Sequence, residues 1–414
     1  MMLLAENHIA GIGRLLEDST RFLLERLDAN GSVYPFIDTK FDIPTGKDFD
    51  DSEDFRRKDH IYGWIQGRGL EALAGAAEYF ERIGNDALAA RIDQVLAPLA
   101  EALENFRLRI GRLSFCMDLQ GRSRFAATEA YNYTDLFYAK GLLAAGMRLK
   151  NTDLSGKGEV LLREVINSIE KRTFRSDQHI FDPANRGGHT AGKYAQGPLM
   201  IALGGTALLK DRTTAIRLME TILKNHFNTG KFFGLEKYDF VEAVDEDGQP
   251  WREKDGAILC DPGHALEFVG LACKNLLQTD DFPQEYLQQL FQLFKKMFDL
   301  GFQENSGIMK GYDLCRRRAL DTNSPWWSLP EAIRAGVLLM KLYPAGGEEL
   351  SIRVELMLKN FFTVFTAQGT HGFAVQTCDK NGKVIRVIPA VPDADPLYHT
   401  NLSLIDVIQN LQKG

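Results

Sequence analysis

The connections between the expected helices alternate between short and long, and this alternation constrains the fold more than any other feature. Apolar residues recur at three- and four-residue steps through most of the 414-residue chain, which predicts amphipathic helices. The expected helices span 8–28, 60–83, 86–107, 128–149, 155–170, 195–209, 212–227, 263–277, 284–300, 325–342, 348–366 and 396–412. Short polar connections such as Gly84-Asn85 and Lys210-Asp211 end the helices of even number, whereas long connections precede them.

The chain thus forms six helical hairpins, in which the connection before each even-numbered helix is long and the connection after it is short. This arrangement predicts a closed ring whose two ends differ. The long connections should build a functional end beside the first turns of the even-numbered helices. Two of them are expected to contain β-hairpins, with turns at Gln120-Gly121 and Asn381-Gly382. An open helical solenoid is the alternative, although no self-similarity at a fixed period supports it. We predict that residues 1–414 form a single domain.

Composition narrows the classes of function. Hydrophobic residues make up 44% of the chain and charged residues 25%, as in a soluble protein with a large core. A net charge of -7 without a basic stretch argues against nucleic acid, and no apolar run reaches the roughly 20 residues of a membrane span. The N-terminus lacks the features of a signal peptide. Five scattered cysteines without a Cys-x-x-Cys pair fit a reducing cytoplasm rather than a disulfide framework.

Two histidines stand in the same context at the starts of even-numbered helices. In Asp261-Pro262-Gly263-His264, the aspartate is a plausible N-cap, the proline suits the first helical position, and the histidine falls in the first turn. Asp395-Pro396-Leu397-Tyr398-His399 repeats this arrangement in the last helix. Glu267, three residues after His264, should project from the same helical face.

Such histidines suit proton transfer next to a carbonyl group. The positive end of the helix dipole lowers the pKa of a first-turn histidine, whereas a carboxylate such as Glu267 raises it and fixes the tautomer. Arg68 could hold the substrate oxygen that gains negative charge, and Trp64 shares its helical face. One helical histidine alone is more often a cap or a polar core residue. The joint placement of these residues at one end of the ring favours a site.

At these residues the chain resembles the N-acylglucosamine 2-epimerase family. The matching segments are Trp64-Ile65-Gln66-Gly67-Arg68, Thr134-Asp135-Leu136-Phe137, Pro262-Gly263-His264-Ala265-Leu266-Glu267, Trp326-Trp327 with Glu331-Ala332, and His399. The resemblance implies an all-α (α/α)6 barrel and chemistry at C2 of an open-chain sugar. It implies that His264 and His399 are the acid/base pair, that Arg68 binds the substrate oxygen, and that Glu267 is the partner of His264.

We therefore expect a sugar 2-epimerase or an aldose–ketose isomerase that works through a cis-enediolate. The expected substrate-binding residues are Trp64, Gln66, Asp135, Trp326, Trp327, Glu331, Tyr398 and His189. We expect no metal site or other cofactor, because no His-x-x-His, Glu-x-x-His or phosphate-loop pattern is present. The expected partner is a reducing sugar, and a homodimer is left open.

Two other functions stay open on the sequence. A glycoside hydrolase or lyase on the same kind of barrel would need paired carboxylates, for which Asp135, Glu267 and Glu331 are candidates. A non-catalytic binding protein is the third hypothesis.

Overall fold

The computed structural model describes residues 6–49, 54–125, 128–179, 181, 190–279, 282–387 and 390–411. These residues form twelve α-helices, and every helix expected from the sequence is confirmed. The helices are α1 Glu6–Asn30, α2 Gly63–Arg82, α3 Asp86–Ile110, α4 Tyr133–Arg148, α5 Thr152–Glu170, α6 Gly197–Leu209, α7 Arg212–His226, α8 Pro262–Leu276, α9 Gln284–Gly301, α10 Ser328–Leu342, α11 Gly347–Asn360 and α12 Ser403–Leu411.

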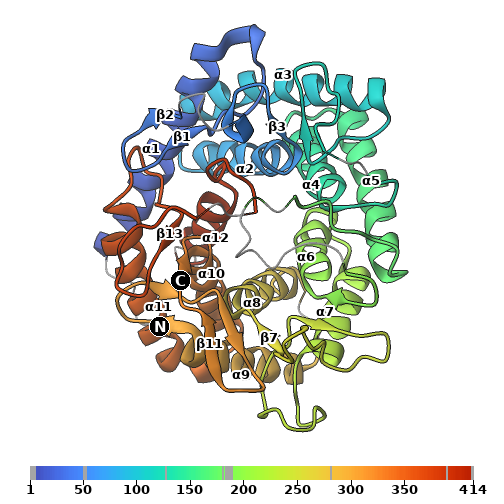
Figure 1. Ribbon diagram of the computed structural model, residues 1–414. Coiled ribbons are helices and arrows are strands. Elements are labelled where there is room, and N and C mark those ends of the chain that lie inside the picture. The colour runs from blue at the N-terminus through green and yellow to red at the C-terminus, as the bar shows by residue number, and fades with distance from the viewer. Residues whose placement is uncertain are drawn as a thin grey trace.

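The helices form a closed double ring (Figure 1). The even-numbered helices line the inside, and the odd-numbered helices pack around them. Each inner helix contacts the next, from α2 to α12. A π-helical turn, Tyr398–Leu402, leads into α12 and packs against α2, which closes the ring. The fold is therefore an (α/α)6 barrel, as expected, and the open solenoid is excluded.

Glycines let the first two inner helices approach closely. A Cβ added to Gly141 on α4 would lie 2.2 Å from the carbonyl oxygen of Gly67 on α2, and one added to Gly67 would lie 2.6 Å from the backbone of Phe137. This backbone contact fixes the position of Arg68 on α2 relative to Phe137 on α4.

Although the inner helices are rich in apolar residues, no helix in the described part of the chain has the length and hydropathy of a membrane span.

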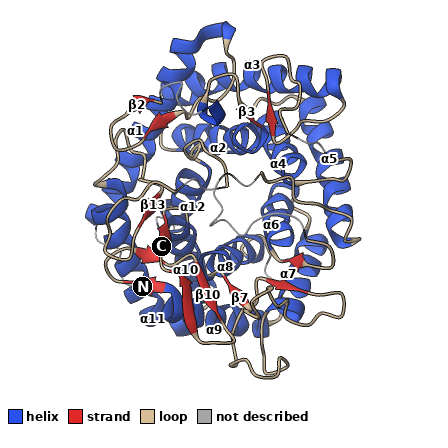
Figure 2. Cartoon of the chain, in the orientation of Figure 1, coloured by secondary structure: helices blue, strands red, loops and turns tan. Residues whose placement is uncertain are grey.

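All described strands lie in the long connections that lead into even-numbered helices (Figure 2). The strands are β1 Phe41–Asp42, β2 Lys47–Asp48, β3 Ile61–Tyr62, β4 Cys116–Met117, β5 Tyr194–Ala195, β6 Ala243–Val244, β7 Leu259–Cys260, β8 Phe302–Gln303, β9 Gly307–Ile308, β10 Gly311–Asp313, β11 Arg318–Asp321, β12 Ser324–Pro325 and β13 Thr377–Cys378. They pair as β1-β2, β3-β4, β5-β6, β8-β9, β12-β13 and the three-stranded β11-β10-β7, all antiparallel.

The two expected β-hairpins are present, but they are shorter than expected. Their turns contain Gly121 and Gly382, and their arms are joined by the isolated bridges Met117↔Ser123 and Cys378↔Val384. The strands β4 and β13 pair mainly with β3 and β12, which come from other connections. These pairings link neighbouring long connections at the end of the barrel that carries the first turns of the inner helices.

Candidate active site

His264 lies in the first turn of α8, and its ring contacts two carboxylates. The side chain of Asp261 accepts the backbone N–H of His264 at 3.2 Å, which confirms the expected N-cap. The imidazole Nδ1 lies 3.0 Å from Glu242 Oε1 and 3.3 Å from Asp261 Oδ2. Burial alone would lower the pKa of His264, but the charges of Asp261 and Glu242 outweigh burial and raise it. Both carboxylates therefore stabilise the protonated form of the ring.

His399 lies in the π-helical turn that precedes α12. The carboxylate of Asp395 accepts the backbone N–H groups of Tyr398 at 3.2 Å, His399 at 3.4 Å and Thr400 at 3.3 Å. The expected cap at Asp395 is therefore confirmed. The expected helical start at the following proline is wrong, because Leu397 adopts a left-handed conformation with φ of 69° and the turn begins only after it.

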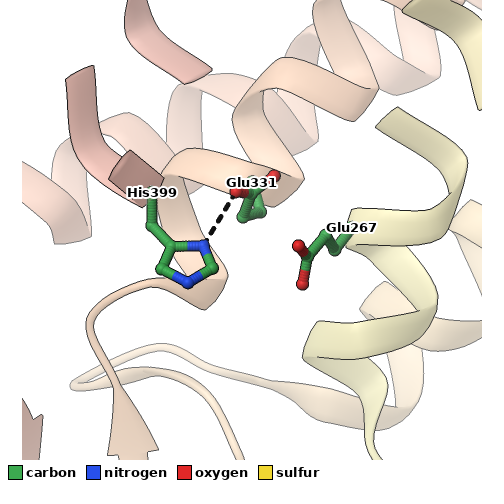
Figure 3. A group of neighbouring side chains, drawn as sticks. All are labelled: Glu267, Glu331 and His399. Atoms are coloured by element: carbon green, nitrogen blue, oxygen red, sulfur yellow. Dashed lines mark hydrogen bonds and ion pairs between the residues drawn. The ribbon is translucent and has the colours of Figure 1, made fainter. Parts of the chain in front are cut away.

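The carboxylate of Glu331, on α10, is the partner of His399 (Figure 3). Nδ1 of His399 lies 3.0 Å from Glu331 Oε1, and Glu331 also pairs with Arg334 one turn along its own helix. Burial opposes ionisation of Glu331, but Arg334 and His399 outweigh it and lower the pKa of Glu331. An ionised acceptor at Nδ1 favours the tautomer whose free lone pair is on Nε2.

Glu267 lies beside His399 and Glu331, and its carboxylate points toward the His399 ring (Figure 3). One donor atom from each of the three side chains lies within 4.8 Å of the others. Burial and the negative charge of Glu331 raise the pKa of Glu267. The expected partnership of Glu267 with His264 is wrong: Glu242 and Asp261 contact that ring instead. The three groups have the spacing of metal ligands, but Arg334 already supplies a positive charge to Glu331.

The indole ring of Trp327 contacts both histidines. Its centroid lies 5.1 Å from that of His264, with an angle of 27° between the ring planes, and 5.7 Å from that of His399. The sum of these two distances is the upper limit for the separation of the histidine rings. His264 and His399 therefore converge on one site, as the sequence analysis predicted.

The guanidinium group of Arg68 packs against three aromatic rings. Its guanidinium carbon lies 4.1 Å from the ring centroid of Phe137, 5.4 Å from that of Trp64 and 5.5 Å from that of Tyr398. Among the described residues it has no hydrogen-bond or ion-pair partner, and its Nε is buried. Burial lowers the pKa of Arg68, and the surrounding tyrosine and carboxylates oppose this effect. Its positive charge thus remains available to a ligand.

Three further expected substrate ligands lie next to these groups, although the structure buries them. Trp64 contacts Arg68 and donates its Nε1–H to Asp177 at 3.2 Å. Trp326 presents its edge to His399, with the centroids 6.4 Å apart. Tyr398 accepts a hydrogen bond from Lys140 at 2.5 Å.

Two other expected ligands have structural roles. Gln66 makes two hydrogen bonds to the backbone of Ile37, at 2.8 and 3.0 Å. Asp135 forms the capping box of α4 with Asn132 and pairs with Arg112. Their polar groups are thus engaged by the protein itself, and their role in substrate binding stays a prediction. His189 lies outside the described residues.

Sequence reasoning missed several charged groups at the site. Glu242 immediately precedes β6, and Asp177 follows α5 in a long connection. Lys310 places its Nζ 2.5 Å from Asp261 Oδ2 and 5.1 Å from the ring centroid of Trp327. Burial raises the pKa of Asp177 to about 6. Long connections have no periodicity, so nothing in the sequence indicated which of their polar residues turn inward.

The fold and the site together define a class of protein: an (α/α)6 barrel with two carboxylate-paired histidines and an arginine without an acidic partner at one end. The N-acylglucosamine 2-epimerase (GlcNAc 2-epimerase) family model matches residues 58–403, so the chain belongs to this family of carbohydrate epimerases and isomerases.

Several solved structures share this fold. A sugar epimerase from a ruminal bacterium and the cellobiose 2-epimerase from Bacillus thermoamylovorans B4167 each superpose with a TM-score of 0.71 at 14% identity, over 97% of this chain and 98% of theirs. A D-mannose isomerase superposes with a TM-score of 0.65 at 13% identity, over 96% of this chain and 98% of its own. No curated protein sequence matches the chain.

Proposed function

We propose that this protein interconverts open-chain reducing sugars by proton transfer at C2, as a 2-epimerase or an aldose–ketose isomerase. One observation carries the proposal: His264 and His399 contact the same indole ring, and each has its own carboxylate partner. Arg68, whose charge has no acidic partner among the described residues, supplies an electrophile. Proton transfer next to a carbonyl needs these three elements.

The first step removes the proton from C2. Nε2 of His399 is the base, because Glu331 holds the proton on Nδ1. The electron pair of the C2–H bond forms a double bond between C1 and C2, and the carbonyl π pair moves to O1. The product is a cis-enediolate, whose negative oxygen is stabilised by Arg68.

The second step returns a proton. Protonated His264, held by Asp261 and Glu242, delivers its proton to the opposite face of C2, and the electrons on O1 re-form the carbonyl group. Isomerisation differs in that C1 receives the proton while the hydroxyl proton of O2 passes to O1, which leaves the carbonyl at C2. Both histidines end in the opposite protonation state, so the reverse reaction starts from His264 as the base.

One observation favours a glycoside hydrolase instead. The pKa of Glu267 is raised and that of Glu331 is lowered, as in the acid and nucleophile of a glycosidase. However, Glu331 is already engaged by Arg334 and His399, which restricts attack on an anomeric carbon. The site therefore fits proton transfer better than hydrolysis.

The test is an incubation in D₂O, followed by NMR. The substrates are N-acetylglucosamine, glucose, mannose and cellobiose, together with the methyl glycoside of each, which cannot open to an aldehyde. We expect deuterium at C2 of at least one free sugar and no change in any methyl glycoside. His371→Asn is the matched control for the variants His264→Asn and His399→Asn. His371 stacks on Phe22 of the outer helix α1 and has the positive φ that Asn tolerates. Cleavage of a glycoside, or no exchange in any free sugar, contradicts the proposal.

A further inference from the structure

The turn that carries His399 has an unfavourable backbone. Leu397 adopts φ of 69° and ψ of 10°, in a region that a branched side chain rarely occupies, and a π-helical turn follows. Such a conformation persists only when its surroundings hold it. Asp395 caps the backbone of the turn, but this does not fix the side chains of Tyr398 and His399.

Lys140 of α4 holds the first of these side chains. The lysine is 1% exposed, and its Nζ donates a hydrogen bond to the hydroxyl of Tyr398 at 2.5 Å. Glu71 of α2 neutralises it at 3.1 Å. A Cβ on Gly204 of α6 would lie 3.0 Å from Nζ, so this glycine leaves room for the ammonium group.

Arg334 of α10 holds the second side chain through Glu331. The arginine is 4% exposed and pairs with Glu331, which contacts Nδ1 of His399. Its Nη1 lies 3.8 Å from Asp406 of α12. A Cβ on Gly270 of α8 would lie 3.1 Å from its Nε, so a glycine again makes room for a buried cation.

We propose that Lys140 and Arg334, the buried cation pair, are positioning residues that fix the turn from two sides and aim Nε2 of His399 at the substrate. Burying a charge costs free energy, and here two cations are buried: Lys140 contacts Tyr398 directly, and Arg334 reaches His399 through Glu331. Neither cation takes part in proton transfer. Arg334 keeps Glu331 ionised as the acceptor at Nδ1, and Lys140 fixes Tyr398, whose ring also contacts Arg68. The effect of the two cations on catalysis rests on the proposed function, whereas their effect on the conformation of the turn does not.

The test compares Arg334→Met and Lys140→Met with Arg148→Met. Arg148 is a matched control: it is a largely buried arginine at the far end of α4 that pairs with Glu81 and Asp93, away from the turn. The first readout needs no sugar. Histidine-selective ¹⁵N labelling reports the tautomer of His399, whose signals are assigned by their loss in His399→Asn. If Lys140→Met does not fold, Lys140→Met combined with Glu71→Gln removes both charges of the pair and is used instead.

We expect the His399 nitrogen signals to shift in both cation variants and to stay unchanged in Arg148→Met. We also expect kcat to fall by ~10²-fold in the cation variants, since displacement of a reacting group by about 1 Å has this effect. KM should change by less than about threefold, because neither cation binds substrate. Unchanged His399 signals in both cation variants overturn the proposal, whatever the sugar assays show. Absence of C2 exchange in the wild-type protein overturns the proposed function instead. In that case, the NMR comparison alone decides whether Lys140 and Arg334 position His399.

Discussion

The close contact between α2 and α4 makes a strong prediction for Gly141→Ala. The added methyl group would lie 2.2 Å from the carbonyl oxygen of Gly67 and 2.9 Å from Cβ of Leu70, whereas non-bonded atoms prefer roughly 3.5 Å. The two helices must therefore separate by about 1 Å. Overpacking of this kind costs ~1–3 kcal/mol of folding free energy.

The same separation should also affect catalysis, because Arg68 follows Gly67 on α2. Displacing the guanidinium by about 1 Å should lower kcat by ~10²-fold. Chemical denaturation measures the stability change, and C2 exchange in D₂O measures the catalytic change.

Gly156→Ala is the matched control for Gly141→Ala. Gly156 lies in the outer helix α5 with no atom near its added Cβ, so alanine should stabilise the protein by ~1 kcal/mol through helix propensity. If Gly141→Ala is as stable and active as the wild type, the packing argument is refuted.

Three further substitutions test individual charges at the site. Glu242→Gln removes one of the two charges that raise the pKa of His264, so this pKa should fall. The alkaline limb of the pH profile of kcat/KM should then move to lower pH, and an unmoved limb argues against His264 as the acid. Arg68→Met should lower kcat by ~10²–10³-fold, the effect of losing one oxyanion donor, as measured by steady-state turnover. Glu331→Gln keeps the shape but loses the charge that holds the proton on Nδ1 of His399, so kcat should fall by at least ~10-fold while KM changes little.

The sequence predicted the architecture well because helical periodicity is a repeated signal. Each of the twelve helices is marked by many apolar positions, and the alternation of short and long connections predicted that the helices form a closed ring. The caps at Asp261 and Asp395 were predictable for the same local reason, since an acidic side chain before a proline is an N-terminal signal. The start of the last helix was not predictable, because Leu397 adopts a conformation that its own chemistry disfavours.

The partners of the site residues were the hardest part to predict. Glu267 was assigned to His264 because the two lie three residues apart on one helix, yet Glu242 of another connection takes that place. Gln66 was assigned to substrate, although the backbone of Ile37 uses both ends of its amide. Contacts between distant segments depend on side-chain direction and on loop paths, and neither is encoded in local periodicity.

In the proposed mechanism, His264 and His399 act on opposite faces of C2. The most direct test measures deuterium exchange at C2 in D₂O for His264→Asn and His399→Asn, starting from each epimer of a substrate pair. We predict that conversion falls by at least ~10²-fold in both variants. Each variant should still exchange deuterium into only the one epimer whose proton faces the remaining histidine. Near-normal conversion by both variants contradicts this mechanism, and so does exchange into both epimers by either variant.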